Sequence, residues 1–225
     1  VEGDVVAGKY ELLRPIGKGG MGAVYEARNL QLDRPVAIKF LRASVARKEE
    51  FRARFEREAK AAGRIEHDNV CEVIDFGTSE TGELYLVMPL LQGRPLSSLI
   101  REKGPLPLEK ILDVLTQTLS ALGAAHRKGF VHRDLKPDNL FLTTVGDRED
   151  FVKILDFGIT KTGVGIEDAE ESVPSLTGTG AVMGTPYYMA PEQARGAKDV
   201  DGRVDIYSMG VILYEMITGK RPIVG

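Results

Sequence analysis

The chain has 225 residues, of which 43% are hydrophobic, so it can bury a core and is not a disordered polypeptide. Its net charge is −3 with acidic and basic residues interspersed, which gives no cluster of Lys and Arg of the kind that binds nucleic acid. The sequence shows neither a membrane-spanning apolar run nor a signal peptide, so we expect this segment in the cytoplasm, with any membrane anchor beyond residue 225. The single cysteine, Cys71, fits a reducing compartment and is expected to be a small core residue.

Residues 10–91 alternate short apolar runs with turns, which predicts a mostly β segment. The turn Asp33-Arg34-Pro35 separates AVYEAR from VAIKFL, so these runs are expected to be antiparallel strands joined by a short loop. One helix is expected at about residues 46–65. Its inward face is marked by residues that recur at helical spacing, namely Phe51, Phe55, Glu58, Ala62 and Ile65.

The periodicity changes after residue 91, which divides the chain into a first lobe, residues 1–91, and a second lobe, residues 92–225. A long amphipathic helix is expected over residues 108–128, ended by Gly129. Its apolar positions are Leu108, Ile111, Leu112, Leu115, Leu119 and Leu122. Later expectations are short strands near residues 130–131, 140–142 and 152–155, a Gly/Ser/Thr-rich loop at 160–180, and a helix at 206–220 that is buried on most sides.

Three glycines, Gly17, Gly19 and Gly22, form a GxGxxG motif. Alone the motif is a weak signal, because dinucleotide-binding folds share it. In those folds it opens a helix, whereas here the residues that follow have strand-like composition and turn back through Pro35. A glycine loop between antiparallel strands can lay its backbone N–H groups over phosphates, so a phosphate-binding hairpin is the favoured interpretation.

The strand VAIK places Ala37 and Lys39 on one face by its period of two. A lysine in an apolar strand is often a surface cation whose stem lies on apolar neighbours. If Lys39 is buried it needs an anionic partner, which Glu58 supplies from the inward face of the helix, with Glu56 as the weaker candidate.

Two further motifs, HRDLKPDN at residues 132–139 and DFG at residues 156–158, stand where short strands are expected to end. With GKGGMGAVY, VAIK, GTPYYMAPE and DIYSMG, they occur in the order typical of one superfamily. The sequence therefore resembles the protein kinases over nearly its whole length, and most closely the eukaryotic-like (Hanks-type) Ser/Thr kinases of bacteria. The resemblance implies an α+β, bilobal kinase fold with a small antiparallel β lobe and a mainly α large lobe that lacks its last helices.

The resemblance implies a Ser/Thr protein kinase that uses ATP and Mg²⁺. Asp134 would accept the proton of the substrate hydroxyl, and Lys136 would contact the transferred phosphate. Lys39 would pair with Glu58. Asn139 and Asp156 would be the metal ligands, since Mg²⁺ prefers oxygen donors.

The nucleotide is expected to contact the glycine loop and the adenine pocket. The residues implied are Gly17, Lys18, Gly19, Gly20, Met21, Gly22, Val24, Ala37, Lys39, Met88, Pro89, Leu91 and Phe141. Met88 would be the gatekeeper, and Pro89, where kinases often have an acidic residue, would offer its carbonyl and stiffen the hinge. Phe141 would either narrow the pocket floor or pack as core.

Other positions are expected to be structural. His132 and Phe157 would join an apolar column, and Asp205 would hold the backbone of HRDL, because a buried charge needs donors. Residues 67–70, HDNV, resemble the HPN turn that follows the regulatory helix. Glu192 would pair with an arginine for which residues 1–225 offer no candidate.

Regulation is expected on the loop between Asp156 and Glu192, where a phosphate would give Arg133 a bidentate partner. Thr177 and Thr179 are the proposed autophosphorylation sites, against the alternative that they are polar loop residues, and Thr185 would hydrogen-bond the catalytic loop. The implied partners are protein substrates with Ser or Thr, and a homodimer for autophosphorylation, in a signalling role.

Two other functions share parts of this pattern. A pseudokinase should have lost a residue such as Lys39, Asp134, Asn139 or Asp156, and all are present. A small-molecule phosphotransferase of related fold generally lacks the GTPYYMAPE segment, which favours protein substrates. The absence of the last helices predicts an exposed apolar patch and self-association of this chain.

Overall fold

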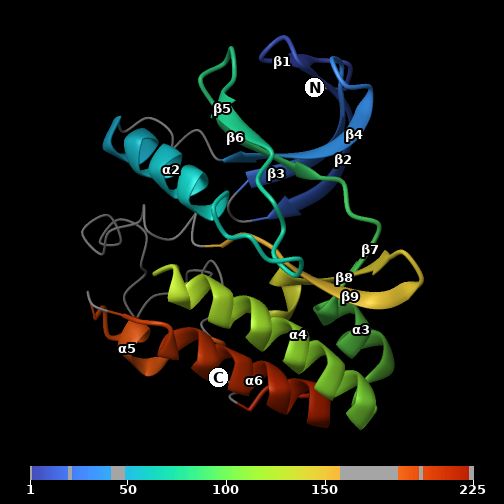
Figure 1. The fold of residues 1–225 in the computed structure, drawn as a ribbon, viewed down its shortest axis with the longest axis vertical. Coiled ribbons are helices and arrows are strands. Elements are labelled where there is room, and N and C mark those ends of the chain that lie inside the picture. Colours follow the sequence, from blue (N-terminus) through green and yellow to red (C-terminus); the bar gives the residue numbers. More distant parts are fainter. Residues whose placement is uncertain (1, 20–21, 42–48, 158–186, 198–199, 223–225) are drawn as a thin grey trace, which may run out of the picture. The chain divides into compact units, whose positions relative to one another are not determined.

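The computed structural model describes residues 2–19, 22–41, 49–157, 187–197 and 200–222 (Figure 1). The chain forms two compact units. The first consists of Val1–Arg64 and Glu72–Leu91, and the second of Ile65–Cys71 and Gln92–Gly225. The polypeptide therefore passes from one unit to the other three times, and a short segment in the middle of the first lobe's sequence belongs to the second unit.

The first unit is built on an antiparallel sheet. Among the described residues it has six strands in the order β1-β2-β3-β4-β6-β5. Their bounds are β1 Val5–Val6, β2 Tyr10–Gly19, β3 Gly22–Asn29, β4 Arg34–Leu41, β5 Asp75–Thr78 and β6 Leu84–Pro89. The glycine motif lies at the β2–β3 hairpin, where Gly19 pairs with Gly22. The expectation of a hairpin, rather than a helix, after the glycines is thus confirmed.

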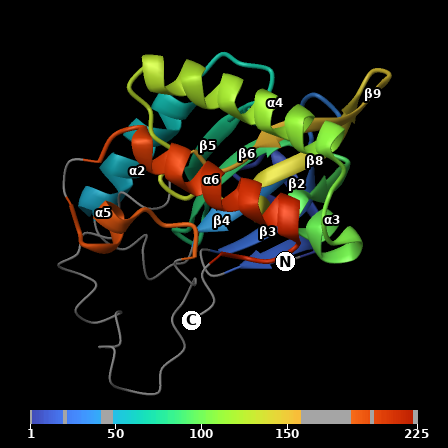
Figure 2. The same cartoon turned by 90° about the horizontal axis from the view of Figure 1, so that it is seen from below.

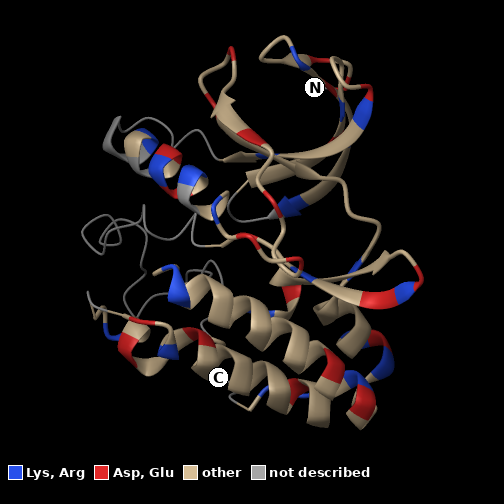
Figure 3. Cartoon of the chain, viewed as in Figure 1, with Lys and Arg blue, Asp and Glu red and all other residues tan. Residues whose placement is uncertain are grey.

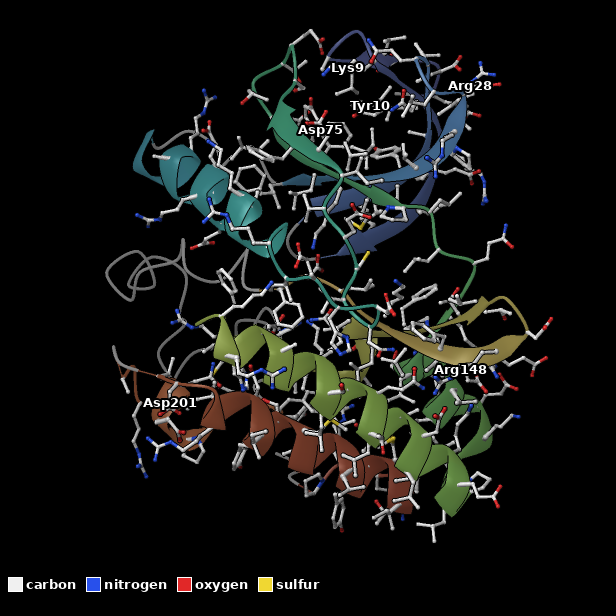
Figure 4. The ribbon with its side chains drawn as sticks, in the orientation of Figure 1. Lys9, Tyr10, Arg28, Asp75, Arg148 and Asp201 are labelled. Atoms are coloured by element: carbon white, nitrogen blue, oxygen red, sulfur yellow. The ribbon has the colours of Figure 1, made fainter. Side chains whose placement is uncertain are left out.

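The sheet of the first unit curls so that its first and last strands approach each other (Figure 1). The hydroxyl of Tyr10 on β2 donates a hydrogen bond of 2.8 Å to Asp75 on β5, and the two side chains point toward one another in Figure 4. The Tyr10 ring also meets the edge of the Tyr85 ring at 6.4 Å between centroids. Burial, the hydrogen bond to Asp75 and its negative charge raise the pKa of Tyr10 well above its ordinary value.

One face of this sheet carries the core of the unit. Its buried members are Val6, Tyr10, Leu12, Ala27, Val36, Ile38, Tyr85 and Val87. Helix α2 (Glu49–Ala62) packs near β5 on the other face, because the Phe55 ring contacts the Phe76 ring edge-on at 6.2 Å. Figure 3 shows acidic and basic residues interspersed along α2. The helix expected at residues 46–65 is therefore present, and residues 42–48 lie outside the described part of the chain.

The second unit combines helices with a small antiparallel sheet, β7-β8-β9, within its described residues. The strands are β7 Gly93–Pro95, β8 Leu140–Val145 and β9 Arg148–Ile154. The helices are α3 Leu96–Lys103, α4 Leu108–Arg127, the 3-10 helix η1 Pro137–Asn139, α5 Pro191–Ala194 and α6 Arg203–Thr218. Helices α4 and α6 lie side by side in both views (Figures 1 and 2).

Helix α4 has the expected bounds and only part of the expected buried face. Leu108, Leu112 and Leu119 are exposed, at 68%, 51% and 38% of their surface. The buried positions are Ile111, Val114, Gln117, Thr118, Ala121, Leu122 and Ala125. Of the expected apolar positions, Ile111 and Leu122 are buried and Leu115 packs against the core, whereas the three exposed leucines lie on a neighbouring stripe of the same helix.

One other expectation was wrong, since residues 130–131 form no strand. The short strand β7 was not among the expected elements. Helix α6 is buried on most sides, as expected, but Ile206, Tyr214 and Ile217 lie on one face that is about half exposed, at 51%, 47% and 53%. The apolar patch expected from the sequence therefore includes one face of α6. Within the described ranges, none of the helices combines the length and hydropathy that crossing a bilayer requires.

Candidate active site

The loop that contains HRDLKPDN is fixed by the buried carboxylate of Asp205 on α6. Backbone N–H groups of His132 and Arg133 donate to its two oxygens, both at 2.8 Å. The ring Nε2 of His126 on α4 lies 2.8 Å from the same carboxylate. Arg133 has a φ of 63°, an uncommon backbone conformation for a residue with a side chain. Asp205 therefore holds a strained turn in place next to Asp134, as the sequence predicted.

His132 and Phe157 form a buried contact behind this loop. Their rings lie 4.9 Å apart, and His132 Nε2 is 2.8 Å from the Leu155 carbonyl oxygen. The Asp134 amide donates to His132 Nδ1 at 3.3 Å, so Nδ1 is the acceptor and Nε2 carries the proton that bonds Leu155. The imidazole thereby connects HRD to DFG within the second unit. Its role is structural, in agreement with the sequence analysis.

Asp134, Lys136 and Asn139 are brought together by the turn into η1. Lys136 Nζ donates to Asp134 Oδ2 at 3.2 Å, and the Asn139 side-chain amide donates to the Asp134 carbonyl at 2.8 Å. The Asp134 and Lys136 side chains keep 18% and 35% of their surface exposed, so both are accessible. A carboxylate and an ammonium thus stand side by side in a turn whose backbone is fixed.

The predicted metal ligands Asn139 and Asp156 are neighbours in the same unit, because the Leu155 amide donates to the Asn139 carbonyl at 2.9 Å. Since Asn139 Nδ2 is used by Asp134, its Oδ1 is the atom left to bind a cation. Asp156 has a φ of 59°, a second strained residue of the site. No group of three His, Cys, Asp or Glu residues in the described part of the chain forms a metal cage. Two oxygen ligands fit Mg²⁺, which commonly completes its coordination with water and phosphate.

Residues 187–193 are attached to this loop and to α6 by contacts that the sequence analysis missed. Gln193 Nε2 donates to the Arg133 carbonyl at 3.0 Å, while its Oε1 accepts from the Ala190 amide at 3.2 Å. The Tyr188 hydroxyl donates to Glu215 at 2.5 Å, and burial together with this acceptor raises the pKa of Tyr188 above its ordinary value. No periodicity or motif spacing signals the contacts of Gln193 with Arg133 and of Tyr188 with Glu215, because these partners lie 60 and 27 positions apart in the chain.

Glu192 is exposed, and its backbone carbonyl accepts from the Ala197 amide at 3.0 Å. The threonines predicted to regulate the site, Thr177, Thr179 and Thr185, lie outside the described residues. The same holds for Gly20 and Met21 of the glycine loop.

The expected nucleotide residues of the first unit share one face of its sheet. Val24 pairs with Lys39, Lys39 with Leu86, and Ala37 with Met88 in the strand registers. Directly opposed residues point to the same face, as do residues two apart on a strand. Val24, Ala37, Lys39 and Met88 therefore line the face opposite the core, with Lys39 only 7% exposed.

The same face carries α2, since Phe76, which contacts Phe55, is the strand partner of Leu86. Glu58 is half-buried on α2 and Glu56 is exposed, which matches the preference for Glu58 as the partner of Lys39.

The hairpin fixes the position of Gly22. Its φ is 153°, and a Cβ there would lie 1.7 Å from the Phe40 carbonyl oxygen. Only glycine fits at this position, because β3 and β4 come too close there for a side chain. A Cβ at Gly17 would lie 3.7 Å from Val24, an ordinary contact, and Gly17 and Lys18 are exposed on β2.

At the end of β6, Pro89 pairs with Val36, and Leu91 is the last residue of the first unit. Phe141 is half-buried on β8 of the second unit and pairs with Pro95. The predicted site residues are thus gathered in two groups, one in each unit.

Comparison with known proteins agrees with these motifs. Residues 10–225 match the family model described as "Protein kinase domain". The chain is 46% identical over 220 residues to the serine/threonine-protein kinase pkn3 of Myxococcus xanthus, covering 98% of this chain and 39% of that protein. It is 44% identical over 227 residues to PknA of Mycobacterium tuberculosis, covering 99% and 50%. The chain therefore spans half or less of the length of these relatives.

Among solved structures, the PknI kinase domain of Mycobacterium tuberculosis superposes with a TM-score of 0.77 at 32% identity. The match covers 99% of this chain and 79% of the PknI chain.

Proposed function

Because the chain belongs to the protein kinase domain family, we propose that it transfers the γ-phosphoryl group of Mg-ATP to Ser and Thr hydroxyls of protein substrates. The observation that carries the proposal is the catalytic loop. There the accessible carboxylate of Asp134 adjoins the Lys136 ammonium on a backbone fixed by Asp205.

The proposed reaction uses positioning more than covalent chemistry. Asp134 orients the substrate hydroxyl and takes its proton as the hydroxyl oxygen bonds to the γ-phosphorus and the bond to the β–γ bridging oxygen breaks. Lys136 stabilises the negative charge that is transferred. When bound, Mg²⁺ neutralises charge on the triphosphate, and Asn139 and Asp156 would hold it. Lys39, oriented by Glu58, would contact the phosphates from the first unit, and ADP is the leaving group.

The remaining site residues are proposed to bind the nucleotide. Backbone N–H groups of residues 17–22 would cover the phosphates, and Val24, Ala37 and Phe141 would contact the adenine ring. Met88, Pro89 and Leu91 would line its edge. The sheet face shared by Val24, Ala37, Lys39 and Met88 supports this assignment. We accordingly propose two functional lobes. Residues 1–91 would bind the nucleotide, and residues 92–225 would carry the catalytic loop.

We propose that the kinase activity is regulated through the charge of Arg133. A phosphate on Thr177 or Thr179, added in a homodimer, would give its guanidinium a bidentate partner, and Thr185 would bond the catalytic loop. We place this signalling activity in the cytoplasm, where ATP is available.

The test of the proposed function is transfer of radiolabelled γ-phosphate from ATP to a generic basic protein. We expect transfer by the wild-type chain with Mg²⁺, and a loss of about 100-fold or more for Asp134→Asn. Equal labelling by both proteins, or none by the wild type, would contradict the proposal. Chelation of Mg²⁺ should abolish the transfer.

A further inference from the structure

Helix α6 ends in a turn that keeps the following residues beside the helix. Gly219 stands at the helix end with a φ of 70°, and its amide donates to the Glu215 carbonyl at 2.8 Å. The Thr218 hydroxyl lies 2.9 Å from the Lys220 carbonyl oxygen, and the Lys220 amide donates to that hydroxyl at 3.2 Å. The next residue, Arg221, is therefore held close to the last turn of α6.

The Arg221 side chain lies on an aromatic ring from the segment before α5. Its guanidinium carbon is 4.3 Å from the centroid of the Tyr187 ring, which is a cation–π contact. Its Nε lies 3.9 Å from Glu215 Oε1, an ion pair longer than a hydrogen bond. The Arg221 side chain keeps 42% of its surface exposed. One face of the guanidinium is thus covered by the ring, while much of the group remains open to water.

The negative charge of Glu215 is largely satisfied within the protein. The Tyr188 hydroxyl donates to its Oε2 at 2.5 Å, and Arg221 lies beside its Oε1. The Glu215 side chain is only 14% exposed. A carboxylate in this setting offers little to a further cation, whereas the arginine presents several N–H donors at the surface. The group of charges therefore presents a positive charge to an incoming molecule.

The segment 187–193 connects this arginine to the catalytic loop within the second unit. At one end, Gln193 donates to the Arg133 carbonyl at 3.0 Å. At the other end, the Tyr188 carbonyl accepts from Ser208 Oγ at 2.6 Å, which holds the tyrosine against α6. A molecule bound along this segment would extend from the catalytic loop toward Arg221.

The length of α6 gives the scale of this surface. Asp205, which holds the loop before Asp134, and Glu215, which adjoins Arg221, are ten residues apart, or about 15 Å along the helix. An extended peptide covers that distance with about four or five residues. A substrate chain whose Ser or Thr reaches Asp134 can thus bring a nearby residue of its own to Arg221.

We propose that Arg221 is a specificity-determining residue that binds an acidic side chain of the protein substrate, about four or five residues from the phosphorylated Ser or Thr. The inference rests on the proposed function, because it requires a substrate chain at Asp134. A guanidinium held on a ring is pre-organised, and its planar fork of donors matches a carboxylate.

Two other interpretations give different results. In the first, Arg221 only closes the turn after α6 and reads no substrate. In the second, the site prefers a basic residue, because Asp138 is an exposed acid on η1 and its charge, like those of Glu215 and Arg221, acts on the Tyr188 hydroxyl. The preferred charge of the substrate decides between these interpretations and the proposal.

The test uses synthetic peptides with one Ser in an uncharged background and a single Glu, Gln or Lys at each position from about two to seven residues before or after it. At the preferred position, we expect kcat/KM to be about threefold to tenfold higher with Glu than with Gln, and lowest with Lys. The advantage of Glu should shrink at about 0.5 M salt, because the pair is partly exposed. Equal rates with Glu and Gln at every position, or a preference for Lys throughout, would overturn the proposal.

Substitutions assign the preference to one side chain. Arg221→Met keeps a long apolar stem without the charge, and the Glu-to-Gln ratio of kcat/KM should fall close to one. Arg221→Lys keeps the charge without the planar fork and should retain part of the ratio. The control is Lys220→Met, which removes the adjacent exposed cation and should keep the wild-type ratio. A wild-type ratio in Arg221→Met would show that Arg221 serves the turn alone.

Binding measurements separate this inference from the proposed function. Fluorescently labelled Glu and Gln peptides with Ala in place of Ser report binding by anisotropy and need no phosphoryl transfer. The Glu peptide should bind about threefold to tenfold more tightly to the wild type, and the two should bind alike to Arg221→Met. Equal binding to the wild type would refute the role of Arg221. A wild type that transfers no phosphate would count against the proposed function, and the binding comparison would still decide this inference. Should Arg221→Met not fold, the salt dependence of the wild type and the Arg221→Lys ratio provide the same decision.

Discussion

A single buried carboxylate, that of Asp205, accepts hydrogen bonds from two consecutive backbone amides and lies beside the His126 ring. An asparagine at this place offers one oxygen and one NH₂ group. One of the two amides would then face a donor and lose its partner inside the protein. The residue thus serves both stability and the geometry of the loop.

We therefore expect Asp205→Asn to lower the free energy of unfolding by about 3 kcal/mol. Phosphate transfer should fall as well, because the turn before Asp134 loses its anchor. Urea unfolding and the transfer assay measure the two effects. The control is Asp201→Asn, an exposed acid just before the same helix, which should change neither. Native stability in Asp205→Asn would show that the loop holds its shape without the charge.

Tyr10 gives a prediction that depends on pH. Its pKa is raised in the folded state, so the folded protein keeps the phenol proton at a pH where the unfolded chain has lost it. The stability from this residue is complete below about pH 10, the ordinary tyrosine value, and declines as the pH rises beyond it. Tyr10→Phe, which cannot ionise, should cost about 1 kcal/mol at neutral pH for the lost hydrogen bond to Asp75.

The measurement is the unfolding free energy of the wild type and Tyr10→Phe at pH 7 and at pH values above 10. The difference between them should shrink at the higher pH. A difference that stays constant would mean that ionisation of Tyr10 is not linked to folding.

At the scale of the elements, the β2–β3 hairpin depends on one glycine. Gly22→Ala places a methyl group against the Phe40 carbonyl and strains φ, so we expect a loss of at least about 2 kcal/mol in stability and a higher KM for ATP. Gly17→Ala, in the same motif, would place its methyl group in an ordinary contact with Val24 and should cost much less stability. Thermal melts and ATP titrations of both variants distinguish them. Equal melting temperatures would show that the hairpin adapts.

The elements that the sequence predicted well are those whose local signals agree. The hairpin followed from glycine and proline chemistry, and the bounds of α4 followed from periodicity and from Gly129, whose φ is 80°. The buried face of α4 was predicted only in part, because a period of 3.6 residues fits two adjacent stripes. Which stripe is buried depends on neighbours. Thr118 can be fully buried there since its hydroxyl donates to the Val114 carbonyl at 2.7 Å.

The candidate site could be predicted further than the packing, because its residues stand in motifs of fixed spacing. Asp134, Lys136 and Asn139 lie within six residues of one another, so their meeting in one turn follows from sequence. Gln193, His126 and Arg221 could not be found in this way. Each acts through a partner more than 30 residues away, and only the fold brings the pairs together.

At the scale of the whole molecule, the exposed face of α6 has a consequence in solution. Ile206 and Ile217 are eleven residues apart, three turns of helix, and so lie on one side of α6 with about half of each side chain in water. Apolar surface of this kind favours association between molecules.

We expect the double variant Ile206→Lys, Ile217→Lys to self-associate less than the wild-type chain. Sedimentation velocity over a range of concentrations is the measurement. Leu32→Lys makes the same change at an exposed leucine outside α6, at 62% exposure on the turn between β3 and β4, and should leave the association unaltered. A wild-type chain that is monomeric at every concentration would refute the expectation.

The route of the backbone through residues 65–71 also limits how the chain can be divided. A break between Leu91 and Gln92 looks like a natural junction, yet the N-terminal piece would carry off Ile65 and Val70, whose apolar neighbours remain on the other piece. The two halves would each expose part of one core, and together they would have matching surfaces. The junction that is simplest on paper is therefore a poor place to separate this protein into independent modules, and a good place to build a pair of complementing fragments.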